Sequence, residues 1–595
     1  MTRSLHRWCW AGIVLTCPAI FQTLAAVSPA GAKPVVRSQT ASTSAQSLSQ
    51  VPPELPRLPN QPIPETPLPD QPLPTLPPPE ELLPSVEPQL PEPPFNETEG
   101  TFFVSTIEIT GSTVFSQADF TDLVAPYLNR QVKFSELLDL RFAITERYVT
   151  AGYVTSGAII PPQTLVDDTV TIQVIEGQLE DIVVTGLTRL NPAYVRSRIG
   201  LASAPPLNIE RLLAGLQRLQ LNPLIETVAA DLQGGSRPNA SLLVVNVAEA
   251  DSFAVDLSLD NYGSPSVGTG QRRLILSEGN LAGRGDRIAL EYENTDGSNE
   301  IDVSYTLPVS PNNDTLRFRA GYSNSRVIDP DFDVLDISSD SFYYEFGYRH
   351  FLIETPTEEL ALGLTLSHQQ NQTFLGLDNI GPFPLSPGAD SQGITQVTAL
   401  RFSQEWSQRS QRHVLAFRSQ FSFGLDLLNA TLNDTGPDSR FLAWRGQGQW
   451  LQRLGADTVL LLRGDAQLTT DDLLSQEEFG LGGPLTVRGY RQNALLRDNG
   501  LLLSAELRSP IARLPDLDAT LQLIPFLDAG VAWNVNADLL SGPNTLLGTG
   551  LGLLWQQGDN LSLRVDLGIP FVPLAEDRNV LQESSIYFSV RYRLF

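Results

Sequence analysis

The sequence predicts a transmembrane β-barrel of about sixteen antiparallel strands, preceded by two small α+β repeats. Three observations support this fold class. From Phe253 to the C-terminal Phe595, apolar and aromatic residues alternate with polar ones in segment after segment. Beyond the N-terminal segment, no stretch approaches about 18 uninterrupted apolar residues, so transmembrane helices are not expected. Ahead of the alternating region, two stretches of about 75 residues share one order of strand and helix patterns.

Residues 1–32 have the pattern of a secretory signal peptide. A short basic start precedes a mostly apolar run over residues 8–26, and Ala30–Ala32 is a candidate cleavage site. An uncleaved N-terminal membrane anchor is the alternative. Pro18 interrupts the apolar run and no long stop-transfer stretch follows, which favours cleavage and export.

Composition argues against several classes of function. The formal net charge is −27 and the pI about 4.5, which disfavours a nucleic-acid-binding surface. Both cysteines, Cys9 and Cys17, lie in the predicted signal peptide, so the exported chain would have no thiol for disulfides or metal ligation. The four histidines are scattered, and no nucleophile–base or acid–base constellation is visible. We therefore expect no metal, no cofactor and no enzymatic activity.

Residues 33–101 are predicted to be a proline-rich linker. Proline dominates residues 51–96, often as Leu-Pro or Pro-Pro. Because proline fixes φ and lacks an amide donor, we expect an extended spacer that forms neither helix nor sheet. A docking site for a proline-binding module is the alternative. No amphipathic helix is evident in this region.

Residues 102–178 and 179–250 are predicted to be the two repeats. In each, the pattern runs strand, helix, helix, strand, strand. The expected elements are 103–110, 115–128, 134–153, 154–160 and 170–175 in the first repeat, and 182–186, 192–199, 209–219, 225–232 and 242–247 in the second. Neither repeat contains a visible active site. We expect the repeats to bind an extended peptide by strand addition, with a role as mere spacers as the alternative.

Residues 251–595 are predicted to form the barrel, with lipid outside and a wet lumen inside. A soluble β-sandwich would also alternate, but with its apolar residues facing inward. The closing strand, 586–594, favours the membrane barrel. It is followed by a terminal aromatic, Phe595, which resembles the recognition signal of outer-membrane barrels, although Phe595 falls on the polar parity of that strand.

A glycine-rich stretch, Phe479–Tyr490, lies in a long connection that we place between the eleventh and twelfth strands. Its last four residues, Val487, Arg488, Gly489 and Tyr490, put a permanent cation beside a glycine hinge and an aromatic ring. This combination makes the stretch a candidate functional loop.

A second stretch, Phe526-Leu-Asp528-Ala-Gly530, supplies an anion in a predicted strand. A bidentate Arg–carboxylate pair gives direction as well as energy. We predict that Arg488 and Asp528 pair inside the barrel and control a polypeptide pore; two unrelated charges are the alternative. In an open, watery lumen the pair would be worth under about 1 kcal/mol. If the pair is desolvated, removing one partner would cost about 3–5 kcal/mol.

Taken together, the signal peptide, the repeats, the barrel and the two motifs resemble the transporters of two-partner secretion, over residues 102–595. These are also called hemolysin secretion/activation proteins and belong to the barrel-assembly superfamily with polypeptide-transport-associated (POTRA) repeats. The resemblance implies an outer-membrane location in a diderm bacterium, with the POTRA repeats in the periplasm. It also implies three partners: a secreted exoprotein as cargo, outer-membrane lipid, and a barrel-assembly machinery for insertion. A membrane-insertion factor, which usually carries more than two repeats, and a passive porin are the alternatives.

The resemblance also implies roles for individual residues. In the family the signature loop folds back into the lumen, and its arginine pairs with the aspartate of the strand motif. Here those residues would be Arg488 and Asp528, with Tyr490 and Phe526 packing around them. Relatives can carry a pore-plugging helix ahead of the first repeat, and residues 33–96 depart from that pattern. Gly548–Gly552 superficially suggests a dinucleotide loop, but strand-like residues follow, so we expect a barrel strand with a smooth lumen face.

Overall fold

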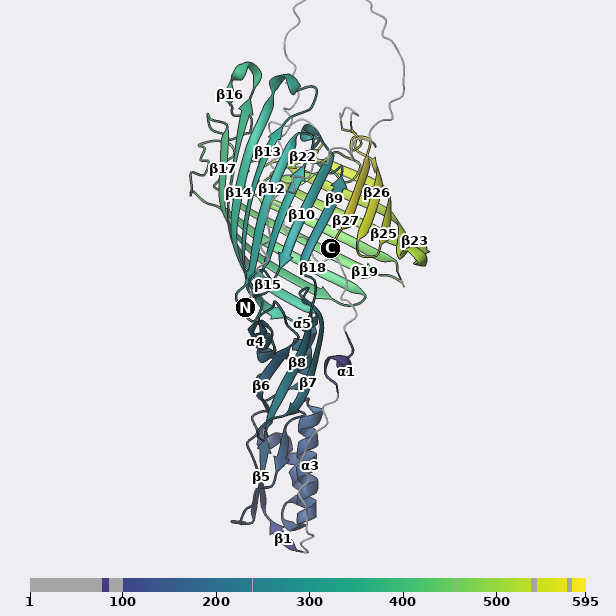
Figure 1. Cartoon of the computed structure of the whole chain (residues 1–595). Coiled ribbons are helices and arrows are strands. Elements are labelled where there is room, and N and C mark those ends of the chain that lie inside the picture. The colour runs from purple at the N-terminus through teal and green to yellow at the C-terminus, as the bar shows by residue number, and fades with distance from the viewer. Residues whose placement is uncertain (1–76, 85–99, 238, 456, 537–542, 575–579) are drawn as a thin grey trace, which may run out of the picture. The chain divides into compact units, whose positions relative to one another are not determined.

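The computed structural model describes residues 77–84, 100–237, 239–455, 457–536, 543–574 and 580–595 (Figure 1). The predicted signal peptide and most of the predicted linker lie outside the described residues. Among the residues that the structure describes, no helix is both long enough and apolar enough to cross a membrane.

The first repeat is a small α+β unit. Its elements are β1 (Thr101–Val104), β2 (Thr106–Thr110), η1 (Gln117–Phe120), α2 (Thr121–Val124), η2 (Ala125–Tyr127), β3 (Arg130–Lys133), α3 (Phe134–Thr150), β4 (Gly157–Ile159) and β5 (Thr169–Ile175). Strand β2 pairs in parallel with β5, and β4 pairs with β5 antiparallel. The apolar face of α3 is fully buried at Leu140, Ile144 and Tyr148, which form the core with the sheet.

Two expectations for the first repeat were wrong in detail. The single strand expected over 103–110 is two strands separated by Ser105, and β1 pairs instead with β3, which the sequence pattern did not reveal. The helix expected over 115–128 is a series of short turns, because Pro126 supplies no amide for a continuing α-helix.

The second repeat follows the expected order throughout. It comprises β6 (Gln178–Thr185), α4 (Pro192–Ala202), α5 (Ile209–Gln220), β7 (Ile225–Gly234) and β8 (Ala240–Glu249). Asn191 and Asn208 cap α4 and α5 by accepting hydrogen bonds from backbone amides of the first turn. The sheet order is β6-β8-β7, with β6 parallel to β8.

Each repeat uses one glutamate in the same way, which strengthens the case for an internal repeat. Glu176 accepts hydrogen bonds from the backbone amide and hydroxyl of Thr113, and Glu249 accepts the same two bonds from Thr188. Burial raises the pKa of both carboxyls, but hydrogen bonds from the next backbone amides and from these threonines outweigh it and hold each pKa below its ordinary value. The loop after β2 in the first repeat and after β6 in the second is thereby fixed to the end of the last strand.

One described part of the predicted linker is helical, which corrects the expectation of a wholly extended spacer. Helix α1 (Pro79–Leu82) is a single turn that begins with proline and carries Glu80 and Glu81 in its first turn. Proline is tolerated at the first helical position, and acidic residues suit the positive end of the helix dipole. Leu82 and Leu83 are buried in the core cluster of the second repeat, so tertiary packing outweighs local preference.

Sixteen long strands among the described residues form a closed antiparallel barrel (Figure 1). They are β9 (Phe253–Asp260), β10 (Gln271–Gly279), β11 (Arg287–Asn294), β12 (Ser298–Pro308), β13 (Thr315–Arg326), β14 (Ile337–Glu354), β15 (Glu358–Leu375), β17 (Ile394–Arg409), β18 (His413–Gly424), β19 (Leu442–Arg453), β20 (Val459–Thr469), β23 (Asn499–Leu514), β24 (Ala519–Trp533), β25 (Thr545–Gln557), β26 (Leu561–Pro570) and β27 (Ile586–Arg593). The two-residue β16 (Gly381–Pro382) pairs only with the end of β15 among the described strands. The expected count of about sixteen spanning strands is therefore confirmed.

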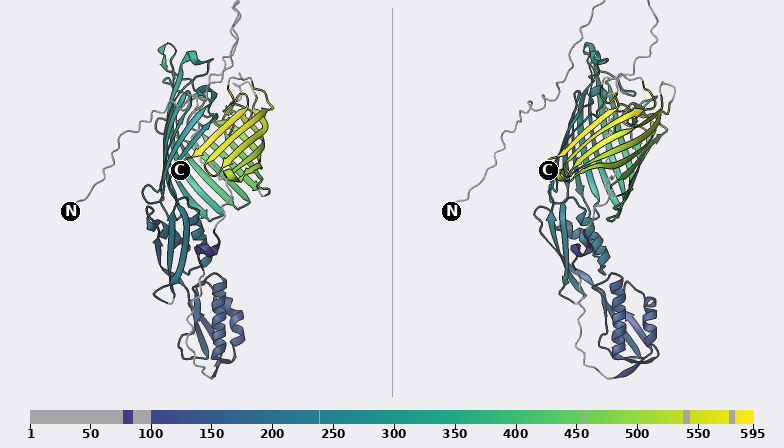
Figure 2. Two further views of the ribbon diagram at one scale, coloured as in Figure 1. Left: turned by 45° about the vertical axis from the view of Figure 1, so that its right-hand side comes forward. Right: turned by 90° about the vertical axis from the view of Figure 1, so that its right-hand side faces the viewer.

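The barrel closes where its last strand meets its first. Strand β27 pairs with β9 from Ser589 opposite Asp260 to Arg593 opposite Asp256. Figure 2 shows the yellow C-terminal strands continuing the same wall as the teal first strands. Closure satisfies every edge, which a sheet exposed to lipid requires.

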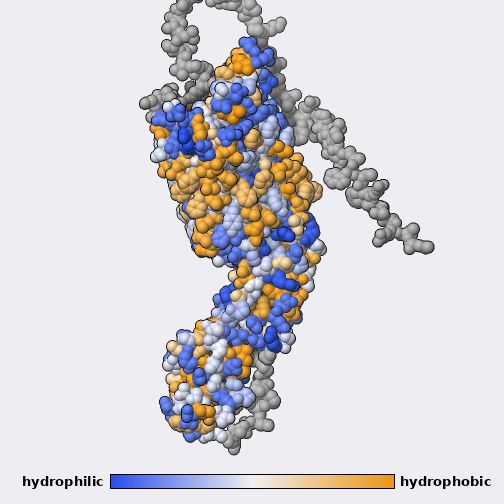
Figure 3. All heavy atoms as spheres, turned by 90° about the vertical axis from the view of Figure 1, so that its left-hand side faces the viewer, coloured by the Kyte–Doolittle hydropathy of each residue, from blue (hydrophilic) through white to orange (hydrophobic). Residues whose placement is uncertain are grey.

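The two faces of the barrel differ as the alternation predicts. Aromatic residues such as Phe318, Tyr322 and Phe346 are exposed on the outer face, whereas Arg319 and Glu345 on the same strands point to the lumen and pair there. Figure 3 shows apolar residues gathered over the barrel strands, with polar residues at the rim. Short 3-10 turns η3 (Pro265–Val267), η4 (Asp333–Leu335), η5 (Leu377–Asn379) and η6 (Pro515–Leu517) lie in the connections.

Candidate functional site

The glycine-rich loop connects β20 to β23, the eleventh and twelfth barrel strands, as expected. Within it, β21 (Phe479–Leu481) and β22 (Leu495–Arg497) pair as a short antiparallel hairpin. Gly482 and Gly483 both adopt positive φ, 103° and 102°, which only glycine adopts without strain. These two residues turn the chain after β21 and so direct the segment that carries Arg488.

The structure brings Arg488 and Asp528 together. The guanidinium donates two parallel hydrogen bonds, Nε to Oδ2 at 2.7 Å and Nη2 to Oδ1 at 2.9 Å. The backbone amide of Arg488 also donates to Oδ2 at 3.1 Å. One aspartate on β24 therefore fixes both the side chain and the backbone of the loop, in the bidentate geometry that gives directional recognition.

The other residues of the strand motif surround this pair. The ring of Phe526 lies beneath the guanidinium, with Cζ of Arg488 3.6 Å from the ring centroid. Gly530 leaves room for the loop, since a Cβ there would meet side-chain atoms of Leu481 at 2.8 Å and of Val487 at 3.1 Å. Phe-x-Asp-x-Gly thus provides a stacking surface, an anion and a gap on one face of one strand.

Sequence reasoning missed a second anion, Glu506 on β23. It lies opposite Phe526 in the sheet register and accepts a hydrogen bond from Nη1 of Arg488 at 2.7 Å. Arg564 and Arg508 also contact this carboxylate, at 2.8 and 2.9 Å. The signal in the sequence is one acidic residue on the lumen parity of the strand, between Ser504 and Arg508. We call Arg488, Asp528, Glu506 and Arg564 the buried charge cluster.

The rest of the loop motif is also held. The Tyr587 hydroxyl, on the last strand, accepts from the Gly489 amide at 2.8 Å and donates to the Tyr490 carbonyl at 2.7 Å. The Tyr490 hydroxyl donates to the carbonyl of Leu547 at 2.9 Å. Val487 and Tyr490 are buried in an apolar cluster with Phe479 and Leu481. The loop segment is therefore bound to β24, β25 and β27 together.

Glycines on two neighbouring strands make this approach sterically feasible. A Cβ at Gly548 of β25 would collide with the carbonyl of Arg488, and one at Gly568 of β26 would lie 2.6 Å from the Gly489 amide. The Gly548–Gly552 run is thus part of a barrel strand with a smooth lumen face and not a dinucleotide loop.

Three of the four cluster residues are almost completely removed from solvent, whereas the side chain of Arg564 is 20% exposed. The side chain of Arg488 is 1% exposed, and those of Asp528 and Glu506 are 0% exposed. Burial alone would lower the pKa of Arg488, but its hydrogen bonds to Asp528 and the charges of Asp528 and Glu506 raise that pKa above its ordinary value. The Arg488–Asp528 pair is therefore desolvated, and removing one partner is expected to cost about 3–5 kcal/mol. The arrangement is therefore suited to holding the loop against the barrel strands through charged groups.

Phe595 lies apart from this site. Strand β27 ends at Arg593, and the Leu594 amide donates to the Val255 carbonyl at 2.9 Å. Phe595 is 72% exposed, with its ring centroid 6.4 Å from that of Phe253 on the first strand. Its suggested role in recognition by an assembly machinery stays a prediction.

Comparisons with known proteins agree with this fold. The chain is 26% identical to the outer membrane transporter CdiB of Escherichia coli over 499 residues, 80% of each chain. It is 21% identical to the heme/hemopexin transporter protein HuxB of Haemophilus influenzae over 402 residues, 66% of this chain and 69% of that one. The solved structure of CdiB from Escherichia coli matches with a TM-score of 0.63 at 23% identity, covering 86% of this chain and 94% of that chain, and so has the same fold.

Two family models match the chain directly. The ShlB-type POTRA domain matches residues 102–177. The model of haemolysin secretion/activation protein ShlB/FhaC/HecB matches residues 239–554, which is more than half of the chain. The chain therefore belongs to the ShlB/FhaC/HecB family of haemolysin secretion/activation proteins.

Proposed function

We propose that the buried charge cluster holds the Phe479–Tyr490 loop inside the barrel, and that its release accompanies passage of cargo through the lumen. As a family member, the chain is a two-partner secretion transporter of the outer membrane, and its partner is a secreted exoprotein. This membership favours transport over the alternatives of an insertion factor and a passive porin. Because the family is one of transporters, we propose no enzymatic activity.

The observation that carries the proposal is the threefold attachment of Arg488 to Asp528 at 0–1% exposure. A polypeptide could occupy this part of the lumen only if the loop moved. Because the attachment is by few, directional, charge-assisted bonds, it is strong when closed and can be lost as a unit.

We assign the rest of the chain in the order that the sequence suggested. Residues 1–32 would direct export, residues 33–101 would link, residues 102–178 and 179–250 would capture unfolded cargo, and residues 251–595 would form the pore. Strand addition is favoured at β7, which has ten residues and pairs only with β8 among the described strands. Outer-membrane lipid would contact the aromatic outer face, and an assembly machinery would insert the barrel.

The test is secretion of a candidate exoprotein by cells that carry Arg488→Ala, Asp528→Ala, or both reversals, Arg488→Asp with Asp528→Arg. The reversal is made with and without Glu506→Gln, because Glu506 would otherwise face the new carboxylate. We expect both single variants to insert normally and lose secretion, and the reversal with Glu506→Gln to recover part of it.

Arg513→Ala is the matched control, since Arg513 is 54% exposed and pairs with Asp457 away from the cluster. It should secrete normally. Unchanged secretion in all the cluster variants, with normal barrel levels, would show that the loop is not the gate.

A further inference from the structure

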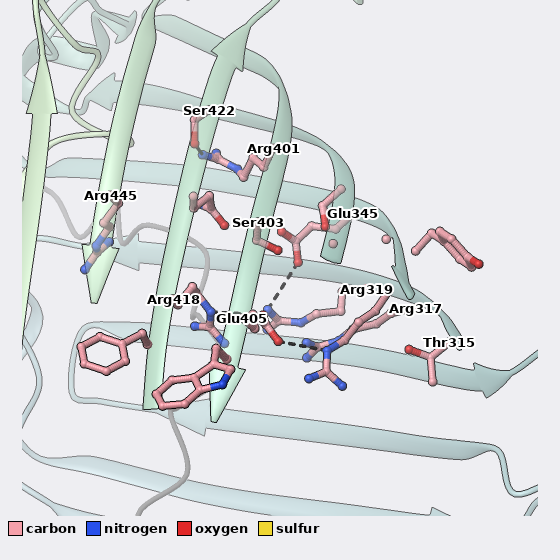
Figure 4. Close-up of a pocket in the computed structure, with 18 of the residues that line it drawn as sticks. Thr315, Arg317, Arg319, Glu345, Arg401, Ser403, Glu405, Arg418, Ser422 and Arg445 are labelled. Carbon is pink, nitrogen blue, oxygen red and sulfur yellow. Dashed lines mark hydrogen bonds and ion pairs between the residues drawn. The ribbon is translucent and has the colours of Figure 1, made fainter. Parts of the chain in front are cut away.

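A second group of charges lies in the lumen, outside the buried charge cluster. A cavity of about 640 Å³ is lined by side chains from β11 through β20 and by the loop residues just before Phe479. We call six of its arginines, on β13, β14, β17, β18 and β19, the basic wall: Arg317, Arg319, Arg349, Arg401, Arg418 and Arg445. Figure 4 shows five of them, all but Arg349, around one space with Glu345 and Glu405 among them.

The basic wall carries a small excess of positive charge. Among the described residues, eight arginines and five glutamates line the cavity, and Asp302 and Asp465 pair with Arg319 and Arg445 from beside the lining. One carboxylate, Glu405, is shared by Arg349 at 2.9 Å and Arg418 at 3.2 Å. A cavity of one dominant sign between low-dielectric walls concentrates ions of the opposite sign. The wall should therefore attract anions.

One carboxylate presented by a polypeptide segment already occupies the wall. Arg401 donates through Nη2 and Nη1 to the two oxygens of Glu477, at 2.6 and 3.0 Å. The hydroxyl of Ser422 accepts from the same guanidinium at 2.9 Å and orients it. Glu477 belongs to the loop that carries Arg488, so a displacement of that loop would separate Glu477 from Arg401.

We propose that the basic wall is a binding surface for carboxylates of a polypeptide in the lumen, and that Glu477 occupies one of its positions while the loop is closed. When the loop is released, the guanidinium of Arg401 would become available to aspartate and glutamate side chains of the translocating polypeptide. Guanidinium suits this role because it is always charged and binds a carboxylate bidentately. That the ligand is a polypeptide rests on the proposed function. Small free anions would bind to the same guanidinium groups.

The experiment measures binding of a fluorescent oligo-glutamate peptide to the purified full chain in detergent, with oligo-lysine as the opposite probe. We expect oligo-glutamate binding to depend on the basic wall, whereas oligo-lysine bound by the acidic chain, of net charge −27, should not respond to wall variants. Arg401→Gln should weaken oligo-glutamate binding by about fivefold, the range of one partly exposed ion pair. Glu477→Gln should strengthen it, because it frees Arg401 without removing a wall arginine. Arg513→Gln, outside the cavity, should not change the binding of either peptide.

Absence of oligo-glutamate binding, or no change of that binding in Arg401→Gln, would overturn the proposal. If Arg401→Gln does not fold, the unmodified chain and Glu477→Gln still decide the outcome, because a merely structural ion pair predicts no gain of binding. Reversal potentials in a KCl gradient test free anions: anion selectivity without oligo-glutamate binding assigns the wall to small anions and overturns the polypeptide ligand. The binding assay needs no secretion, so a failure of the gating proposal in cells is distinguishable from a failure here.

Discussion

The lumen contains two sets of arginine–carboxylate pairs that differ in burial. In the buried charge cluster, Arg488 and Asp528 are 1% and 0% exposed. In the basic wall the pairs are more exposed, 35% and 25% for Arg349 and Glu405 at 2.9 Å, and 16% and 10% for Arg401 and Glu477. One loop contributes to both, through Arg488 to the cluster and through Glu477 to the wall.

The difference shows that the same chemistry can serve two purposes. Removing one member of a desolvated pair leaves a buried charge without a partner, which costs about 3–5 kcal/mol. A pair in contact with water contributes about 0–1 kcal/mol, because water replaces a lost partner. The cluster is therefore suited to holding the loop, and the wall to exchanging one carboxylate for another.

The largest effect is expected from Arg488→Ala. It leaves both Asp528 and Glu506 buried without their shared cation, so docking of the loop should weaken by about 3–5 kcal/mol. Limited trypsin digestion after Arg491 of the loop measures this, because a docked loop resists cleavage. Arg513→Ala is the control. Cleavage at the rate of the unmodified protein would contradict the view that the cluster holds the loop.

A smaller effect is expected from Glu506→Gln, which preserves shape but removes charge. Asp528 still holds Arg488, so the loss should be that of a hydrogen bond to a charged group, about 1.5–3 kcal/mol. Glu405→Gln is the matched variant in the wall, since Glu405 accepts from two arginines and Glu506 from three. It should cost under about 1 kcal/mol in the same digestion assay. Equal losses of loop docking in Glu506→Gln and Glu405→Gln would contradict a decisive role for burial.

Gly489→Ala should weaken loop docking by about 1–3 kcal/mol. Gly489 has φ of 110°, and a Cβ would lie 3.1 Å from the nitrogen of Pro570. Gly436→Ala is the control outside the loop: Gly436 also has a positive φ, 86°, but no atom lies within 4 Å of a Cβ there. Trypsin sensitivity should rise in the Gly489 variant alone. A rise in neither would show that the close approach of the segment to β26 is dispensable.

Local patterns predicted the barrel and the Arg488–Asp528 contact, because alternation and motif chemistry are visible within short stretches. They did not predict Glu506, since a single acid in a strand acquires meaning only when register places it opposite Phe526. Helix α1 was missed for a related reason. Its Leu82 is buried by a repeat more than a hundred residues away along the chain, at Leu212 and Leu216, and no local signal overrides the prolines.

The smallest effect is expected from Arg349→Gln, and its salt dependence sharpens the comparison. The pair with Glu405 is partly exposed, so its loss should change trypsin sensitivity and thermal stability by under about 1 kcal/mol. Salt screens charges that contact water and affects desolvated pairs much less. Raising KCl should therefore abolish the difference between Arg349→Gln and the unmodified chain, while the defect of Arg488→Ala persists. If Arg349→Gln were as damaging as Glu506→Gln at every salt concentration, the wall would be a structural element like the cluster, and exchange of carboxylates on it would lose its physical basis.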